Sequence, residues 1–239
     1  QNKYSPGLTL QDMESIKRQV PNIQAVSPEI IYETSFIRNG RMRSGKLVGV
    51  NEHYLNINNF TVDQGTGFTP IHMEDARRVA VIGSDVKTKF FAGQNPIGQR
   101  IKAGSVWLTV VGVLEERELS TENIQNLGIR NYNLDIFVPV TTALLRYKNR
   151  AMVTGQEIQQ AAAERNDNNS DNGNSQSQPA NYHQIDKLIL QVSDTKYSVP
   201  IADVVRRMLQ RRHNAVVDFE VIVPELLLQQ ERRTQEIFN

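Results

Sequence analysis

Apolar side chains near the start of the chain recur every three or four residues, at Leu10, Met13, Ile16 and Val20. This spacing predicts an amphipathic helix that ends at Pro21, because proline cannot continue a helix. Thr9 is expected to cap the helix, and Asp12, three residues further on, completes a variant of the capping box. The first element of the chain is therefore predicted to be a capped helix with one apolar face.

A β-hairpin is predicted directly after this helix. Residues 23–37 are rich in Ile, Val, Thr and Tyr, which favours an extended strand. Asn39-Gly40 suits a tight turn in which both central residues take positive φ. Residues 42–50 then return as the partner strand.

The middle of the chain is predicted to be mainly β-structure. Short apolar runs favour strands at 79–82 and 136–138 and a hairpin of Ile101 with 106–114 around Gly104. Short helices are expected over 84–91, with Ser84 as the cap, and over 141–147. Residues 166–178 are nearly all Asn, Asp, Ser, Gln and Gly, and they cannot bury enough apolar surface to offset the entropy of ordering, so a disordered loop is predicted there.

The last section repeats the pattern of the first. Leu188, Leu190 and Val192 alternate as on a strand, and Pro200 is expected to open a helix with one apolar stripe of Ile201, Val204, Val205, Met208 and Leu209. A strand over 217–223 and a final helix from Pro224 are predicted to follow. The two ends therefore predict one α/β unit, and the β-rich middle is predicted to be inserted into it.

Composition narrows the possible functions. The 239 residues carry 27 Lys and Arg against 26 Asp and Glu, a formal net charge of +1, so no nucleic-acid partner is expected. The chain has no cysteine, which excludes disulfides and thiolate metal sites. No apolar run reaches the roughly 18–20 residues that would cross a bilayer.

Candidate chemical motifs are incomplete. Residues 40–46 resemble the start of a phosphate loop, but Leu47 replaces the Ser or Thr that would bind magnesium, and a strand is expected to follow instead of a helix. Ser84 lacks the second glycine of a nucleophile elbow. The remaining candidates are interpreted as solvated or structural: the histidines as surface or loop residues, the glutamates as an exposed turn, the arginines as a solvated face and the aromatic residues as core. These are His53, His72, His183, His213, Glu115, Glu116, Glu118, Arg206, Arg207, Arg211, Arg212, Trp107 and Phe219.

No catalytic, cofactor-binding or metal-binding residue is therefore predicted, and the partner-binding residues are left open. A chain of this length without a catalytic set favours a binding or coupling module over an enzyme. A free-standing soluble enzyme remains an alternative, which assays of hydrolase and ATPase activity would test.

An ordered series of phrases resembles the periplasmic core domain of MacB, FtsX and lipoprotein-release permeases. The phrases include Val79-Ala-Val-Ile-Gly83, Asn95-Pro-Ile-Gly-Gln99, Val110-Val-Gly-Val-Leu114 and Ile136-Phe-Val-Pro-Val140. The similarity covers nearly the whole chain. It departs from the family pattern at the polar run 166–178 and at Asn131-Tyr-Asn-Leu134.

The resemblance implies an α+β fold. A discontinuous porter-like subdomain is expected from 1–56 and 184–239, with a mainly β, Sabre-like subdomain inserted over 57–183. It also implies transmembrane helices outside the chain, a stalk helix over 226–238, and a location on the periplasmic side of the bacterial inner membrane.

The function implied by the resemblance is a non-catalytic role in a MacB-like ABC transporter. A cytoplasmic ATPase domain would drive export of antibiotics, peptides or toxins by mechanotransmission, and the implied partners are a second copy of the chain, a periplasmic adaptor and an outer-membrane channel. Two alternatives keep the same fold: a lipoprotein-release domain that docks a periplasmic carrier, and an FtsX-type domain that activates a murein hydrolase.

Overall fold

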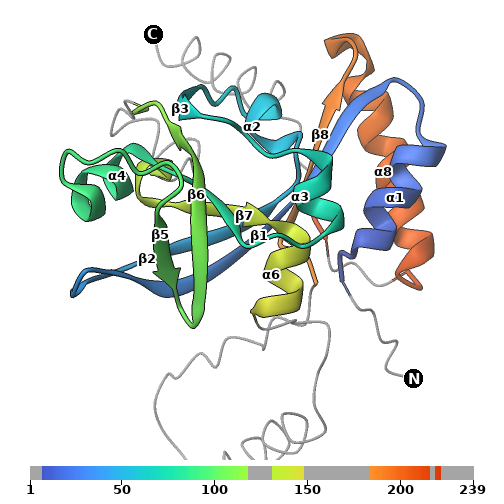
Figure 1. Cartoon of the computed structure of the whole chain (residues 1–239). Coiled ribbons are helices and arrows are strands. Elements are labelled where there is room, and N and C mark those ends of the chain that lie inside the picture. Colours follow the sequence, from blue (N-terminus) through green and yellow to red (C-terminus); the bar gives the residue numbers. More distant parts are fainter. Residues whose placement is uncertain (1–6, 118–130, 148–183, 216–218, 222–239) are drawn as a thin grey trace, which may run out of the picture.

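The computed structural model describes residues 7–117, 131–147, 184–215 and 219–221. The predicted loop at 166–178, the predicted stalk helix at 226–238, Glu118 and His183 lie outside these residues. The described chain contains both helices and an extensive sheet, so the α+β class is confirmed (Figure 1).

Six strands close into a ring at the centre of the molecule (Figure 1). In spatial order they are β2 (Arg41–Val50), β7 (Ile136–Pro139), β4 (Val79–Ile82), β6 (Val106–Leu114), β5 (Arg100–Ala103) and β1 (Ile23–Arg38). Pairing of β1 with β2 joins the two ends of this order. Two pairs, β2 with β7 and β4 with β6, are parallel, and the other pairs of the ring are antiparallel. The ring is therefore a small closed barrel, which leaves few unpaired strand edges.

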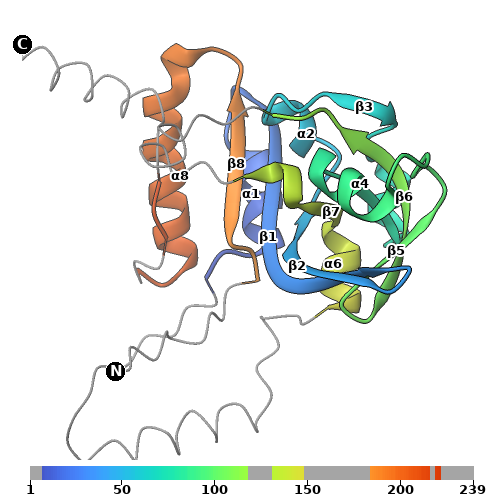
Figure 2. The ribbon, with the colours of Figure 1, turned by 90° about the vertical axis from the view of Figure 1, so that its left-hand side faces the viewer.

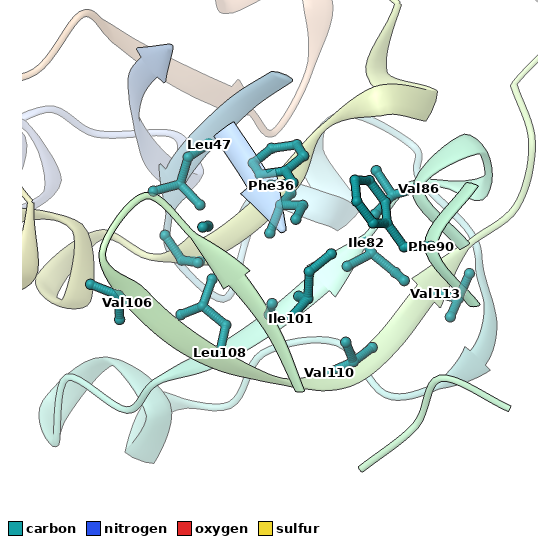
Figure 3. Close-up of a cluster of buried hydrophobic side chains, with 14 of the residues drawn as sticks. Phe36, Leu47, Ile82, Val86, Phe90, Ile101, Val106, Leu108, Val110 and Val113 are labelled. Carbon is teal, nitrogen blue, oxygen red and sulfur yellow. The ribbon is translucent and has the colours of Figure 1, made fainter. Parts of the chain in front are cut away.

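The interior of the barrel is filled by apolar side chains (Figure 3). Phe36, Leu47, Ile101 and Leu108 point inward and are almost fully buried. Helix α4 (Ser84–Phe91) contributes Val86, Phe90 and Phe91 to the same cluster. The alternation of buried residues along each strand follows from the two-residue period of β-structure.

A second apolar cluster lies on part of the outer face of the barrel. It is formed by α2 (Tyr54–Ile57), β3 (Val62–Gly65) and α3 (Pro70–Glu74) against β2, β4 and β7. Tyr54 and Phe137 are fully buried at its centre, with ring centroids 5.7 Å apart. The short helix α6 (Val140–Arg146) covers Gly49 of β2. Within the described residues, Met42 and Trp107 on the outer face of β2 and β6 are left exposed.

Strand β1 continues beyond the barrel and joins it to the two ends of the described chain (Figure 2). Its first half, from Ile23 to Glu29, pairs with β8 (Lys187–Val192). Helices α1 (Leu10–Gln19) and α8 (Ser198–Arg212) pack together over this pair through Ile16, Val20, Ile201, Val205 and Leu209. Two short 3₁₀ turns, η1 (Tyr132–Leu134) and η2 (Thr195–Tyr197), complete the elements.

Most predicted elements are confirmed within a residue or two. The capping box at Thr9 and Asp12 is present, and Asn39 and Gly40 both have positive φ, at 47° and 73°. Helix α8 begins at Ser198, two residues before the predicted start at Pro200. Residues 219–221, the described part of the strand predicted at 217–223, belong to no strand.

Four predictions about single residues are wrong. Gly83, not Ser84, is the N-cap of α4, and the Ser84 hydroxyl makes no hydrogen bond within the described chain. Trp107 is 44% exposed because it points outward between the inward-facing Val106 and Leu108. Val204 is 46% exposed, because it lies at the edge of the apolar stripe of α8. His213, predicted as a surface or loop residue, is buried and only 1% exposed.

The predicted division of the chain at residues 56/57 and 183/184 stays a prediction. β1 and β2 come from the first predicted segment, whereas β5 and β7 come from the middle one. These strands pair with one another, so the sheet runs across the predicted boundary.

Candidate functional site at the junction of the two chain ends

Asp12 is a buried carboxylate in the first turn of α1. It is the third residue of the helix, and its backbone N–H donates to the Thr9 hydroxyl at 3.2 Å. Its Oδ2 atom accepts a hydrogen bond from the Thr9 backbone N–H at 3.0 Å. The local sequence thus fixes this side chain at the N-terminus of a helix, where the helix dipole favours negative charge.

Two residues at the other end of the described chain contact the same carboxylate. Arg212, the last residue of α8, donates from Nε to Asp12 Oδ1 at 2.5 Å. His213 Nε2 lies 3.1 Å from Asp12 Oδ2. The Asp12 and His213 side chains are 3% and 1% exposed, whereas that of Arg212 is 34% exposed. The ring of Phe219 meets the His213 ring edge-on, with 5.6 Å between centroids.

Electrostatics keep Asp12 ionised. Burial favours the neutral acid, but hydrogen bonds from Arg212, His213 and Thr9 outweigh it and hold the pKa of Asp12 below its ordinary value of 3.8. An ionised carboxylate can only accept hydrogen bonds. His213 therefore carries a proton on Nε2, and the contact is a hydrogen bond donated to Asp12.

Further hydrogen bonds join the segment before β8 to both α1 and β1. The Leu10 backbone N–H donates to Gln184 Oε1 at 2.9 Å, and the Ile185 N–H donates to the Leu8 carbonyl at 3.1 Å. On the other side, Asp186 Oδ2 accepts from the Ile31 N–H at 2.7 Å. Together with Asp12, these contacts join the first and last described elements into one body, which we call the terminal junction.

The terminal junction is not arranged for bond chemistry. An aspartate that orients a histidine is typical of a catalytic triad, but such a site also needs a nucleophile and access for substrate. Both Asp12 oxygens are already bound, the His213 ring is enclosed, and the nearby Thr9 hydroxyl is used in the capping box. The arrangement holds two helices together.

Other candidate sites on the described chain offer no alternative centre. No group of three or more His, Cys, Asp or Glu residues within these ranges could hold a metal ion. A surface hollow of about 710 Å³ is lined by Gln64, Lys87, Gln94 and neighbouring residues. A second, of about 830 Å³, is lined by Arg207, Gln210, Arg211, Asn214 and Ala215 on α8 and just after it.

The structure separates most of the sequence candidates. Residues 40–46 form the turn and first half of β2, so no helix follows the phosphate-loop-like phrase. His53 lies 3.4 Å from Glu52, and His72 takes part in the capping box of α3. The remaining arginine candidates, Arg206, Arg207 and Arg211, are exposed on α8, and Arg206 pairs with Asp203 at 2.6 Å. Glu115 and Glu116 follow β6 and are exposed.

Sequence reasoning missed the roles of Arg212 and His213. The sequence predicts Arg212 on a solvated face and His213 as a surface or loop residue, because the local pattern shows only their own helix. The available sequence signal for a further partner was Asp12. The capping box fixes this residue at the start of α1, and its carboxylate can accept more hydrogen bonds than Thr9 donates. Its partners are 200 and 201 residues away, so no local pattern could have identified them.

The class of protein that these features define is an α+β domain whose first and last described helices are joined through a buried carboxylate. The family model for the MacB-like periplasmic core domain matches residues 1–171. The chain therefore belongs to the family of MacB-like periplasmic core domains, the transport-associated part of an ABC transporter permease family, and the predicted membership is confirmed.

Two relatives that are similar to parts of the chain are named as export proteins. A stretch of 140 residues, 58% of the chain and 20% of the relative, is 29% identical to macrolide export ATP-binding/permease protein MacB 2 of Yersinia pestis bv. Antiqua (strain Antiqua). Over 230 residues, 95% of the chain and 29% of the relative, it is 27% identical to the pyoverdine export ATP-binding/permease protein PvdT of Pseudomonas putida. The chain thus spans less than a third of the length of these relatives.

Solved structures share the fold. The periplasmic region of MacB from Actinobacillus actinomycetemcomitans matches with a TM-score of 0.67 and 18% identity, covering 95% of this chain and 83% of that one. The extracellular domain of the transporter YknZ from Gram-positive bacteria matches with a TM-score of 0.63 and 16% identity, covering 91% and 90%. Within the described residues, no helix combines the length and apolar character needed to cross a bilayer.

Proposed function

We propose that this chain is the non-catalytic periplasmic domain of a MacB-like exporter, and that it passes movement from the membrane to the exported substrate. ATP hydrolysis would occur in a separate cytoplasmic domain, coupled through membrane helices and a stalk that includes residues 226–238. The working unit would be a homodimer with a periplasmic adaptor and an outer-membrane channel. Its similarity to a macrolide export protein and a pyoverdine export protein favours compounds of these two kinds as substrates.

The terminal junction is the observation that supports this proposal. A coupling domain must respond as one unit to forces that enter at its two ends, so the first and last elements must be held together. Asp12 does this directly, because one carboxylate binds the start of α1 and the end of α8. Both helices also pack on the β1–β8 pair, and β1 continues into the barrel.

The test is transport by the full-length transporter that contains this chain. Asp12→Asn would weaken the junction but keep the size of the side chain, and Asp203→Asn, at an exposed position of α8, is the matched control. Export of a fluorescent substrate, ATP hydrolysis and the amount of transporter in the membrane would be measured together.

We expect Asp12→Asn to lower export per ATP hydrolysed about tenfold at an equal amount of transporter, with Asp203→Asn unchanged. Arg212→Lys keeps the positive charge and should give an intermediate loss. Unchanged export per ATP in Asp12→Asn would contradict a coupling role for the junction.

A further inference from the structure

One row of side chains crosses four strands on the outer face of the barrel. Strand register places Met42 of β2 opposite Ile37 of β1, Ile37 opposite Lys102 of β5, and Lys102 opposite Trp107 of β6. Their sequence neighbours, Phe36, Ala103, Val106 and Leu108, are buried in the barrel, so the four side chains point outward. Met42 is 63% and Trp107 44% exposed. We call these four residues the outer row.

The surroundings of the outer row are basic. Residues 34–51 and 86–114 supply most of both hairpins and of α4, and they contain eight Lys or Arg residues and no Asp or Glu; Asp85 lies in the first turn of α4. The whole chain is nearly balanced, with 27 cations and 26 anions, so this is a local segregation of charge. Arg41, Arg100 and Lys102 form no ion pair within the described residues. Two nearby acids face cations of this surface: Glu33 lies opposite Lys46 in the register, and Asp63 pairs with Lys87 at 3.7 Å.

Local contacts hold parts of this surface in place. The Arg100 guanidinium lies 5.5 Å from the centre of the Trp107 ring. Arg41 donates to the Lys89 carbonyl at 3.1 Å, and Arg38 donates to the Arg100 carbonyl at 2.8 Å. Tryptophan and arginine that are already ordered lose little entropy on binding, and they are enriched among the residues that dominate the energy of interfaces.

The position of the apolar residues favours a protein partner over a lipid surface. The tips of the two hairpins are polar, at Asn39-Gly40 and Gly104-Ser105, whereas a hairpin that enters a bilayer carries its apolar residues at the tip. The outer row lies on the face of the sheet, behind both tips. A face of this kind fits a polypeptide that brings apolar side chains onto Met42 and Trp107 and carboxylates onto the surrounding cations.

We propose that the outer row and its cations form a docking surface for an acidic polypeptide segment in which apolar and carboxylate side chains alternate. The surface lies on the barrel, away from the terminal junction, and the inference does not depend on the coupling function proposed above. Charge complementarity supplies the orientation of the partner, and the exposed apolar side chains supply the contact area.

Trp107 provides a direct measurement, because it is the only tryptophan of the chain. The probe is a ten-residue peptide of alternating glutamate and leucine, titrated into the full 239-residue chain while Trp107 emission is recorded. The comparison probes are the same peptide with lysine in place of glutamate, and vesicles of phosphatidylglycerol. The variants are Arg100→Glu, Lys102→Glu and Met42→Ser, with Lys187→Glu on β8 as the control for charge reversal at a distant exposed site.

The glutamate peptide is expected to shift Trp107 emission to shorter wavelength. Its Kd should rise about tenfold in Arg100→Glu and in Lys102→Glu, and about fivefold in Met42→Ser, with Lys187→Glu unchanged. Raising the salt concentration to about 0.5 M should weaken binding in the same direction.

Three results would overturn the proposal: no shift with the glutamate peptide, an equal shift with the lysine peptide, or a Kd for the glutamate peptide that is the same in the native chain as in both charge-reversal variants. A shift with the vesicles alone would assign the surface to a membrane instead of a polypeptide. Circular dichroism will show whether each variant is folded. Arg100 is exposed, so reversing its charge is expected to leave the barrel intact.

Discussion

The carboxylate of Asp12 and the imidazole of His213 lie 3.1 Å apart although 201 residues separate them in the sequence. Both side chains are buried, and Arg212 binds the second oxygen of the same carboxylate. The Asp12 carboxylate therefore joins the first helix to the end of the last described helix. It has almost no access to solvent, so Arg212 and His213 take the place of water around its charge. This geometry makes the terminal junction sensitive to single substitutions at Asp12.

Asp12→Asn is expected to lower the free energy of unfolding by about 2–3 kcal/mol. The amide would keep part of the capping interaction but lose the charge that Arg212 and His213 bind. The value is below that of a fully buried pair, because the Arg212 side chain is one-third exposed and solvent screens part of its charge. Urea unfolding followed by circular dichroism measures the change.

Asp203→Asn is the matched control for that measurement. Asp203 also pairs with an arginine, Arg206 at 2.6 Å, but both side chains are about half exposed. Its loss should change the free energy of unfolding by no more than about 0.5 kcal/mol. Equal losses in the two variants would show that burial of Asp12 has no energetic consequence.

The stabilisation by Asp12 should depend on pH in a defined direction. Its pKa is lower in the folded chain than the ordinary value of 3.8, so the unfolded state binds a proton more readily. The contribution is therefore fully present above the unfolded pKa and is lost as the pH falls through the folded pKa.

Urea unfolding of the native chain and of Asp12→Asn at a series of pH values tests this direction. The difference in free energy of unfolding should be constant at neutral pH and should shrink as the pH falls below about 4. A difference that grows on acidification would contradict the lowered pKa.

Close packing around Gly83 predicts a large cost for a single added methyl group. A Cβ at this position would lie 2.2 Å from the Asn133 carbonyl oxygen and 2.7 Å from that of Tyr132. Both neighbours are backbone atoms and cannot turn away, so Gly83→Ala should cost about 3 kcal/mol. A thermal unfolding curve or a urea titration would show the loss.

Gly67→Ala is the control, because its added Cβ would meet only the flexible Leu55 Cδ1 atom at 3.3 Å. It should change the free energy of unfolding by less than about 1 kcal/mol. If Gly83→Ala were as stable as Gly67→Ala, the approach of η1 to the start of α4 would be looser than the structure shows.

Local sequence patterns predicted the structural elements that depend on interactions between residues close together in the sequence. The capping box at Thr9 and Asp12, the turn at Asn39-Gly40 and most strands follow from interactions within a few residues. The closure of the barrel and the partners of Asp12 depend on contacts between distant segments, which no local pattern contains. Family resemblance supplied the fold class but none of the residues of the terminal junction.

Trp107 shows a different source of error. Residues 106–114 are apolar on both faces of the strand, so the sequence alone did not show which face is buried. The structure places Val106, Leu108 and Val110 inside the barrel, which forces Trp107 outward. Arg100 of β5 lies opposite Thr109 of β6, two residues after Trp107, and its guanidinium lies over the face of the Trp107 ring.

Hydrogen exchange of the amides in α1 and α8, compared between the native chain and Asp12→Asn, tests most directly whether the two chain ends form one body. If they do, weakening the junction should expose both helices to exchange together, with protection falling by a similar factor of about fifty in each. A loss of protection confined to one helix, with the other unchanged, would contradict a single unit that could pass movement between the two ends.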